Sequence, residues 1–401
     1  MFVKFGLLLR KLTLTLNFES GTEIVLGTPK EVVITTNSDG KIEVISSDGS
    51  IVEVITETSI DENLVQYVSG YCIQGVEAGN ATITIRVKAS ENYFAVEKSF
   101  AVTVKSVIRY GYRINKNESD PYARVEYLYD AAGLTPAHMD FANGVFDYGD
   151  WGDKWFITDN KPCMLKNDGT ASDVANTAYN GNAMAQIPLV WVYRYEDENY
   201  EYEIISNKQV NENYKAYAHT RADGSIADYF YWSMFGGSNV NNVIRSLKNQ
   251  SLSSDLTAET EINRCKANGA TYFTHTWSQH ELIRTLLVLI GKSTNTEAVF
   301  GMGNCVNGGN ASSMKITGLL SDKGQFFGYN SINQVKVFHI EKFYGDQWDR
   351  VAGLINYYGN IYVKMTSEGT GYRVNDVNGY TNTGITSVGI NGKLFISWFN
   401  E

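Results

Sequence analysis

The chain has 401 residues, of which 43% are hydrophobic and 19% charged, and its formal net charge is -10. This length predicts two or three domains, each large enough to bury a core of its own. The acidic balance argues against a nucleic-acid partner and against an anionic membrane surface, because phosphate-rich surfaces are bound by basic patches. Tyrosine is frequent, with 26 residues, and such rigid aromatic side chains are favoured on binding surfaces and on exposed strands alike.

The first 18 residues contain an apolar stretch that Arg10 and Lys11 interrupt, and no small-residue cleavage site follows it. No window reaches the roughly 18 apolar residues that a membrane-spanning helix needs. We therefore expect synthesis in the cytoplasm without a cleaved signal, and no membrane insertion.

The cysteines lack the close spacing of zinc sites or small disulfide scaffolds. We expect all four to be reduced and mostly buried: Cys72, Cys163, Cys265 and Cys305.

Up to about residue 105, short runs alternate apolar and polar residues, which predicts β-strands. Turn-forming sequences separate several runs, such as Ser38-Asp39-Gly40 and Ser47-Asp48-Gly49. The pattern predicts a small β-sandwich. The expected strands cover residues 12–16, 32–34, 41–45, 51–55, 81–87 and 100–104.

Residues 75–104 read GVEAGNATITIRVKASENYFAVEKSFAVTV, and this segment resembles the closing half of bacterial immunoglobulin-like domains. The resemblance covers about residues 12 to 105. It implies an Ig-like spacer domain over residues 1–107, which extends or anchors its neighbour and carries no chemistry of its own.

From Arg109 onward the sequence becomes aromatic, Asn-rich and Gly-rich, with few periodic elements. One helix is predicted up to Gly291, because Ser278 and Glu281 fit a capping box and apolar residues then recur at helical spacing. A second helix is predicted over about residues 258–268, ended by Gly269. The chain is therefore expected to be mainly β, with an α+β C-terminal part. Tryptophans are expected to order the long loops by packing: Trp151, Trp155, Trp191, Trp232 and Trp348.

Residues 335–365 read VKVFHIEKFYGDQWDRVAGLINYYGNIYVKM, which predicts an alternating strand, an aromatic and Gly-rich elbow and a second strand pair. Together with residues 124–155 and 318–330, this run resembles the C-type-lectin-like domains of phage tail proteins and diversity-generating variable proteins. The resemblance covers about residues 109–384. It implies a C-type-lectin-like domain, related to formylglycine-generating enzymes, over residues 108–401.

The resemblance also implies roles for single residues of the YGDQWDRVAGLI block. Trp348 would fill the core, and Gly345 and Gly353 would allow tight bends. In the related proteins, further sequence follows the position of residues 379–384 and supplies the last strands and the ligand face. This chain ends at Glu401, so we expect the usual terminal segment to be missing. Either the fold closes differently, or a partner chain supplies that segment.

The function that the resemblance implies is that of a virion protein. It would be made in the host bacterial cytoplasm, lie on the tail or capsid surface, and bind a host-surface glycan or protein without catalysis. The alternative is a structural decoration or assembly protein whose lectin-like domain docks onto another virion protein. A third alternative is an enzyme of the formylglycine-generating class or a glycan hydrolase. Because a shallow aromatic surface binds weakly and gains from several copies, we expect a homo-trimer.

The expected ligand contacts are aromatic and polar side chains in the C-terminal part of the chain, where rings can stack on sugars or apolar patches. The alternative for each is that it packs a loop. These residues are Tyr329, Asn330, Asn333, Tyr344, Asp346, Tyr357, Tyr358 and Tyr380.

Asp147, Asp150 and Asp153 place three carboxylates in one aromatic loop, which is a candidate calcium site because calcium prefers hard oxygen ligands. Their spacing differs from that of known calcium loops, so ordinary acidic turn residues are the alternative. His275 and His280 flank Trp277 and are expected to be structural rather than metal ligands. The motifs of common hydrolases, metalloproteases and phosphate-binding loops are missing, so no catalytic residue and no further cofactor are predicted.

Overall fold

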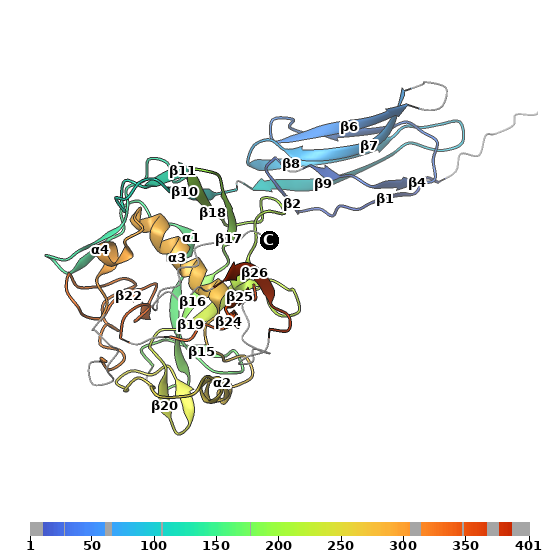
Figure 1. The fold of residues 1–401 in the computed structure, drawn as a ribbon. Coiled ribbons are helices and arrows are strands. Elements are labelled where there is room, and N and C mark those ends of the chain that lie inside the picture. Colours follow the sequence, from blue (N-terminus) through green and yellow to red (C-terminus); the bar gives the residue numbers. More distant parts are fainter. Residues whose placement is uncertain are drawn as a thin grey trace, which may run out of the picture. The chain divides into compact units, whose positions relative to one another are not determined.

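The computed structural model describes residues 11–27, 29–60, 66–105, 107–176, 178–304, 314–346, 349–366 and 377–386. The protein is mainly β, with several antiparallel sheets and a few helices (Figure 1), as the sequence predicts. It divides into two compact units, which we describe separately. Unit 1 consists of residues 1–108 and 210–212, and unit 2 of the remaining residues. None of the helices in the described ranges has the length and hydropathy needed to cross a bilayer.

Unit 1 is built from two small sheets and one further strand pair. One sheet has the strand order β2-β9-β8-β5, the other has the order β3-β7-β6, and β1 pairs with β4. The strands are β1 (Leu14–Leu16), β2 (Thr22–Val25), β3 (Lys30–Glu31), β4 (Ile34–Thr36), β5 (Ile42–Ser46), β6 (Val52–Ile60), β7 (Gln66–Gly75), β8 (Gly79–Val87) and β9 (Val96–Lys105).

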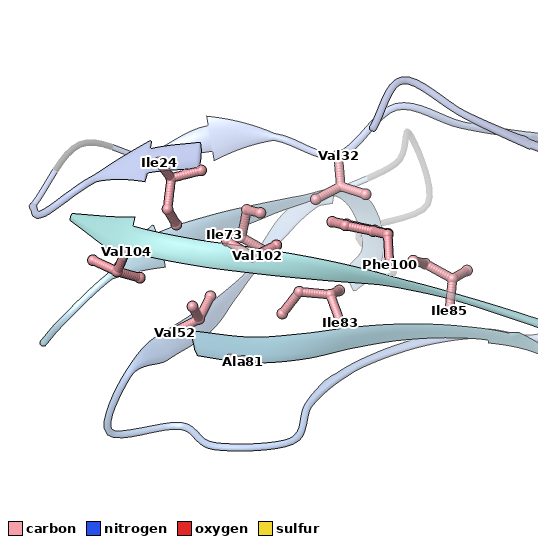
Figure 2. Close-up of a cluster of buried hydrophobic side chains, with 10 residues drawn as sticks. All are labelled: Ile24, Val32, Val52, Ile73, Ala81, Ile83, Ile85, Phe100, Val102 and Val104. Atoms are coloured by element: carbon pink, nitrogen blue, oxygen red, sulfur yellow. The ribbon is translucent and has the colours of Figure 1, made fainter. Parts of the chain in front are cut away.

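The core of unit 1 contains side chains from both sheets (Figure 2). Ile83 of β8 and Val102 of β9 are fully buried together with Val52 of β6 and Ile73 of β7. Because successive side chains of a strand point to opposite faces, the alternating pattern of β8 produces one buried face and one exposed face. Strand residues make up most of five of the six expected segments, whereas the segment 32–34 overlaps β4 only at Ile34. The sequence did not predict β2, β3 and β7.

Unit 2 contains two four-stranded antiparallel sheets. The first has the order β11-β10-β18-β17, and the second has the order β15-β14-β16-β19. Their strands are β10 (Arg109–Asn115), β11 (Val125–Tyr129), β14 (Lys161–Leu165), β15 (Ala171–Ser172), β16 (Asn182–Pro188), β17 (Trp191–Glu196), β18 (Tyr200–Ser206) and β19 (Tyr229–Ser233). The smaller strands are β12 (His138–Asp140), β13 (Val145–Asp147), β20 (Ser238–Val240), β21 (Val243–Arg245), β22 (Lys336–Val337), β23 (Ile340–Glu341), β24 (Leu354–Tyr357), β25 (Asn360–Val363) and β26 (Thr381–Thr386).

The two predicted helices are present in unit 2. They are α2 (Ala258–Lys266), after which Gly269 adopts a φ of +149°, and the almost entirely buried α3 (Trp277–Gly291). The predicted cap of α3 was wrong. Thr276 is the N-cap and forms the capping box with Gln279, while Ser278 Oγ donates to the Thr366 carbonyl at 2.9 Å. The short helices α1 (Trp155–Thr158), η1 (Tyr217–His219) and α4 (Thr296–Phe300) were not predicted.

The strand predicted at the start of residues 335–365 is instead a tight hairpin. β22 and β23 pair Val337 with Ile340, and the two residues between them, Phe338 and His339, have φ values of +48° and +65°. Two left-handed central residues are typical of a type I′ turn, which usually contains Asn or Gly. The second strand pair of this run, β24 and β25, is present. Gly345 and Gly353 adopt left-handed φ values of +87° and +84°, as tight bends require.

Trp151 behaves as the sequence predicts for a loop-ordering residue. It is fully buried and makes edge contacts with Tyr110 and Tyr127, at centroid distances of 5.3 and 5.6 Å. The core role predicted for Trp348 lies outside the described residues.

A buried ion network attaches α3 to the first sheet. Glu203 of β18 accepts from Arg284 of α3 at 2.6 Å and pairs with Arg194 of β17 at 3.2 Å. Its second oxygen also accepts from the Thr285 hydroxyl. Burial opposes the ionisation of Glu203, but the two guanidinium groups outweigh it and lower its pKa to about 2. The network therefore holds a charged carboxylate inside the unit.

The core of unit 1 supplies the first prediction. Ile83→Ala removes a fully buried side chain and leaves a cavity, so we expect it to lower the free energy of unfolding of unit 1 by about 3 kcal/mol. Ile45→Ala, at a position that is 43% exposed on β5, should cost far less. Urea unfolding of both variants measures this, and equal destabilisation would contradict the described core.

The ion network supplies the second prediction. Because the folded pKa of Glu203 lies below its unfolded value of 4.5, its charge adds stability that is fully present above pH 4.5. That stability is lost as the pH falls toward 2. Glu203→Gln should therefore lower the unfolding free energy of unit 2 by about 3 kcal/mol at pH 7 and by clearly less at pH 3. Urea titrations at both values test this, and a pH-independent difference would contradict it.

Candidate ligand-binding cleft

Unit 2 contains an open cleft of about 1000 Å³ between the second sheet and the segments that follow it. β19 contributes every one of its five residues to the lining, which read YFYWS. The remaining walls come from β14, β16, β21, α2, the loop of residues 253–256 and the segment 271–275 that leads into α3. A volume of this size is typical of small-molecule or short-polymer sites.

Aromatic rings form much of this cleft. Tyr229 is 46% exposed and contacts the partly buried Tyr231 edge-on at 5.3 Å. The Tyr272 hydroxyl donates to the Leu165 carbonyl at 3.1 Å, which fixes that ring against β14. Trp232, only 8% exposed, stacks on His275 at 4.7 Å. The cleft therefore offers rigid, amphipathic surfaces of the kind that binding sites favour.

The charged groups of the cleft are engaged with neighbouring residues. Arg350 donates to the Glu261 carboxylate at 2.5 Å and to the Leu256 carbonyl at 2.8 Å, which ties the 349–366 segment to α2. Arg245 donates to the Asn182 side chain at 2.9 Å and to the Gly181 carbonyl at 2.8 Å. These contacts fix the walls of the cleft.

Two titratable groups of the cleft, His275 and Cys265, are held uncharged. Burial, together with a smaller effect of the neighbouring His280, lowers the pKa of His275 to about 3, so the ring is neutral at pH 7. Burial also raises the pKa of the Cys265 thiol to about 12, with Glu261 adding to the effect. These groups favour hydrogen bonding and stacking over proton transfer or nucleophilic attack.

The eight residues predicted as ligand contacts do not line this cleft. One group surrounds the loop of residues 301–303, where the Met302 amide donates to the Tyr329 carbonyl, the Asn333 amide donates to the Gly303 carbonyl and the Tyr344 hydroxyl donates to the Gly301 carbonyl. Asn330 follows Tyr329 and is exposed.

Asp346 belongs to the same region but is buried, since it is only 4% exposed. Its Oδ1 atom accepts from the Lys315 amide at 3.0 Å and from Asn304 at 2.5 Å. Its Oδ2 atom lies 3.8 Å from Lys342 Nζ, so the carboxylate is a buried, internally paired group rather than an exposed contact.

The second group lies on the sheet of β24, β25 and β26. Tyr357 and Tyr358 contact each other at 4.5 Å, and Tyr358 is 87% exposed. Tyr380 directly precedes β26, whose first residue Thr381 lines a smaller cavity of about 270 Å³. The structure therefore places the eight residues in two groups, and their role in binding stays a prediction.

The three carboxylates of the candidate calcium site do not converge. Asp147 accepts from the Gly149 amide at 2.9 Å, Asp150 accepts from the Thr135 amide at 2.7 Å, and Asp153 pairs with Lys154 at 2.6 Å. Among the described residues, no group of three or more His, Cys, Asp or Glu side chains is arranged to hold a metal ion. The loop uses its acidic residues as local turn and ion-pair partners.

The cysteines are free where they are described. Cys72, Cys163 and Cys265 form no disulfide and are partly buried, so the expectation that they are mostly buried was too strong. Cys305 lies outside the described residues.

One local sequence pattern coincides with the cleft. Residues 229–233 contain four aromatic residues in five positions and are followed closely by Gly236 and Gly237.

Comparison of the chain with protein-family models and with curated proteins found no match. The functional inference therefore depends on the geometry of the cleft.

The state of Cys265 supplies the third prediction. With its pKa raised to about 12, iodoacetamide should modify it at pH 7.5 at least tenfold more slowly in the folded protein than in urea, because only the thiolate reacts. Mass spectrometry of the Cys265 peptide over time measures this. A folded-state rate equal to the rate in urea would contradict the raised pKa.

Proposed function

We propose that this chain is a non-catalytic phage virion protein that binds a glycan or protein receptor on the bacterial surface through the cleft of unit 2. The observation that carries this proposal is the aromatic cleft of about 1000 Å³ lined by all of β19. Its rings are held in place by the sheet and by hydrogen bonds, so little conformational entropy is lost when a ligand binds. The neutral His275 and the protonated Cys265 support binding rather than turnover.

Within this proposal, unit 1 is an Ig-like spacer and unit 2 a C-type-lectin-like domain. Two sheets around one core in unit 1 support the first assignment. Few helices among many short strands and long loops in unit 2 support the second. Presentation of several copies, as in a trimer on the tail or capsid surface, would strengthen weak single-site binding.

The second candidate is an assembly or decoration role, in which unit 2 docks onto another virion protein. The highly exposed Tyr358, which lies with Tyr357 at the turn between β24 and β25, favours this candidate. Exposed aromatic residues of this kind are common at the centres of protein interfaces.

The fourth prediction tests the proposed function with the full chain and intact cells of candidate host bacteria. Wild-type protein should bind saturably, and Tyr229→Ala combined with Tyr231→Ala should weaken binding at least tenfold because the exposed rings of the cleft are lost. Tyr357→Ala combined with Tyr358→Ala is the matched control and should bind like the wild type. A calcium chelator should have no effect, because the three loop aspartates are engaged locally.

Two results would contradict the proposal. Loss of binding in the β24–β25 control with normal binding of the β19 variant would place the receptor site on the predicted aromatic residues. If virions with a chain that lacks unit 2 fail to assemble, whereas virions with the cleft variant assemble and adsorb normally, the assembly role holds instead.

A further inference from the structure

Among the strands that the structure describes, none pairs with the second edge of β19, which makes it an edge strand. It pairs with β16 alone, and the register joins Gln186 to Tyr231 and Ala185 to Trp232. In an antiparallel pair, only alternate residues exchange hydrogen bonds with the partner strand. The hydrogen bonds at the two ends of β19 show which of its residues bond to β16.

These end bonds involve even-numbered residues of this segment. The Met234 amide donates to the Ala183 carbonyl at 2.9 Å, and the Leu189 amide donates to the Asp228 carbonyl at 2.8 Å. Because every second residue of the strand is bonded in the same way, Phe230 and Trp232 are the residues of β19 that bond to β16. The backbone N–H and C=O groups of Tyr229, Tyr231 and Ser233 must then point away from β16. No hydrogen-bond partner for these groups occurs in the described part of the chain.

The cleft runs along this free edge. Side chains of neighbouring strand residues point to opposite faces of a sheet, and both Tyr231 and Trp232 line the same cavity. A cavity that reaches both faces of an edge strand passes along its unpaired side. The strand also carries no charge, proline or bulge, the features that normally protect an exposed edge from pairing.

We propose that the cleft binds an extended polypeptide segment of the receptor, which adds to β19 as a further strand. This rests on the proposed function and specifies its ligand as polypeptide. The backbone of the segment pairs with Tyr229, Tyr231 and Ser233, and its side chains alternate between the ring of Tyr272 on one side and the stacked pair of Trp232 and His275 on the other. The five residues of β19 give a paired length of about 17 Å.

The charges of the cleft specify the segment further. Four basic and four acidic side chains line it, so the cavity carries no net charge. An apolar, uncharged segment therefore fits better than a strongly acidic or basic one. A glycan could stack on the rings, but its hydroxyls do not repeat with the two-residue period of the free amide and carbonyl groups.

The fifth prediction uses a random heptapeptide library selected on the full-length protein. The selected peptides should be rich in apolar and β-branched residues. A scan that methylates one backbone nitrogen at a time should weaken binding at least tenfold at every second position and little at the positions between. Failure to select any peptide, or a methylation profile without this alternation, would overturn the proposal.

The role of the free β19 backbone is tested with the substitutions Ser233→Pro and Ser233→Ala. Proline removes the Ser233 N–H, which makes no bond to β16, so the ladder is kept. Ser233→Pro should weaken peptide binding at least tenfold, while Ser233→Ala keeps the amide and should bind as the wild type. Equal binding by the two variants would overturn strand addition. If Ser233→Pro does not fold, the methylation scan remains decisive.

The cell-binding experiment separates this inference from the proposed function. In one outcome, host-cell binding needs the Tyr229 and Tyr231 rings and is competed by host glycan but not by the selected peptide. This outcome would overturn the polypeptide ligand and leave the receptor role standing. Peptide binding without any cell binding would contradict the receptor role and leave strand addition standing.

Discussion

The buried carboxylate of Glu203 is the contact on which the arrangement of unit 2 depends. It joins β18, β17 and α3, since Arg194 and Arg284 both bond to it. A buried charge is stable only when its partners hold it closely, so the position of α3 against the sheet is strongly restricted. α3 begins directly after the segment 271–275, which forms one wall of the cleft. The ion network therefore restrains that wall through the helix that follows it.

A second wall is restrained from the C-terminal side. Thr276 and Ala352 form a bridge, and Arg350 bonds to Glu261 of α2. The walls of the cleft thus come from segments that lie about 70 to 90 positions apart in sequence and are joined to each other by hydrogen bonds. Such a site is largely preformed, which reduces the entropy that binding must offset.

Local patterns were sufficient to predict several elements. The helical spacing of apolar residues located α2 and α3, and alternation located most strands of unit 1. The hairpin at Phe338 and His339 was not predictable in this way, because two non-glycine residues adopt left-handed conformations that tertiary contacts impose. β7 was missed because Gly70 and Gly75 weaken the alternation of its sequence.

The cleft could not be located from sequence for a related reason. Composition indicated aromatic binding residues, but the eight predicted contacts all lie between Tyr329 and Tyr380, outside the cleft. Whether an aromatic strand is buried, paired or left as an edge depends on partners more than 40 positions away, as with Trp232 and Ala185. Likewise, the acidic residues of the Asp147 loop are close in sequence, but each bonds to a different partner.

The free edge of β19 can be measured by residue-resolved amide hydrogen exchange, in the free protein and with a saturating selected peptide. In the free protein, the amides of Phe230 and Trp232 should exchange slowly because they are bonded to β16, whereas those of Tyr231 and Ser233 should exchange rapidly. Peptide binding should slow the second pair selectively. If Tyr231 and Ser233 are already protected in the free protein, or stay unprotected in the complex, β19 does not offer a free edge to a ligand and the account is wrong.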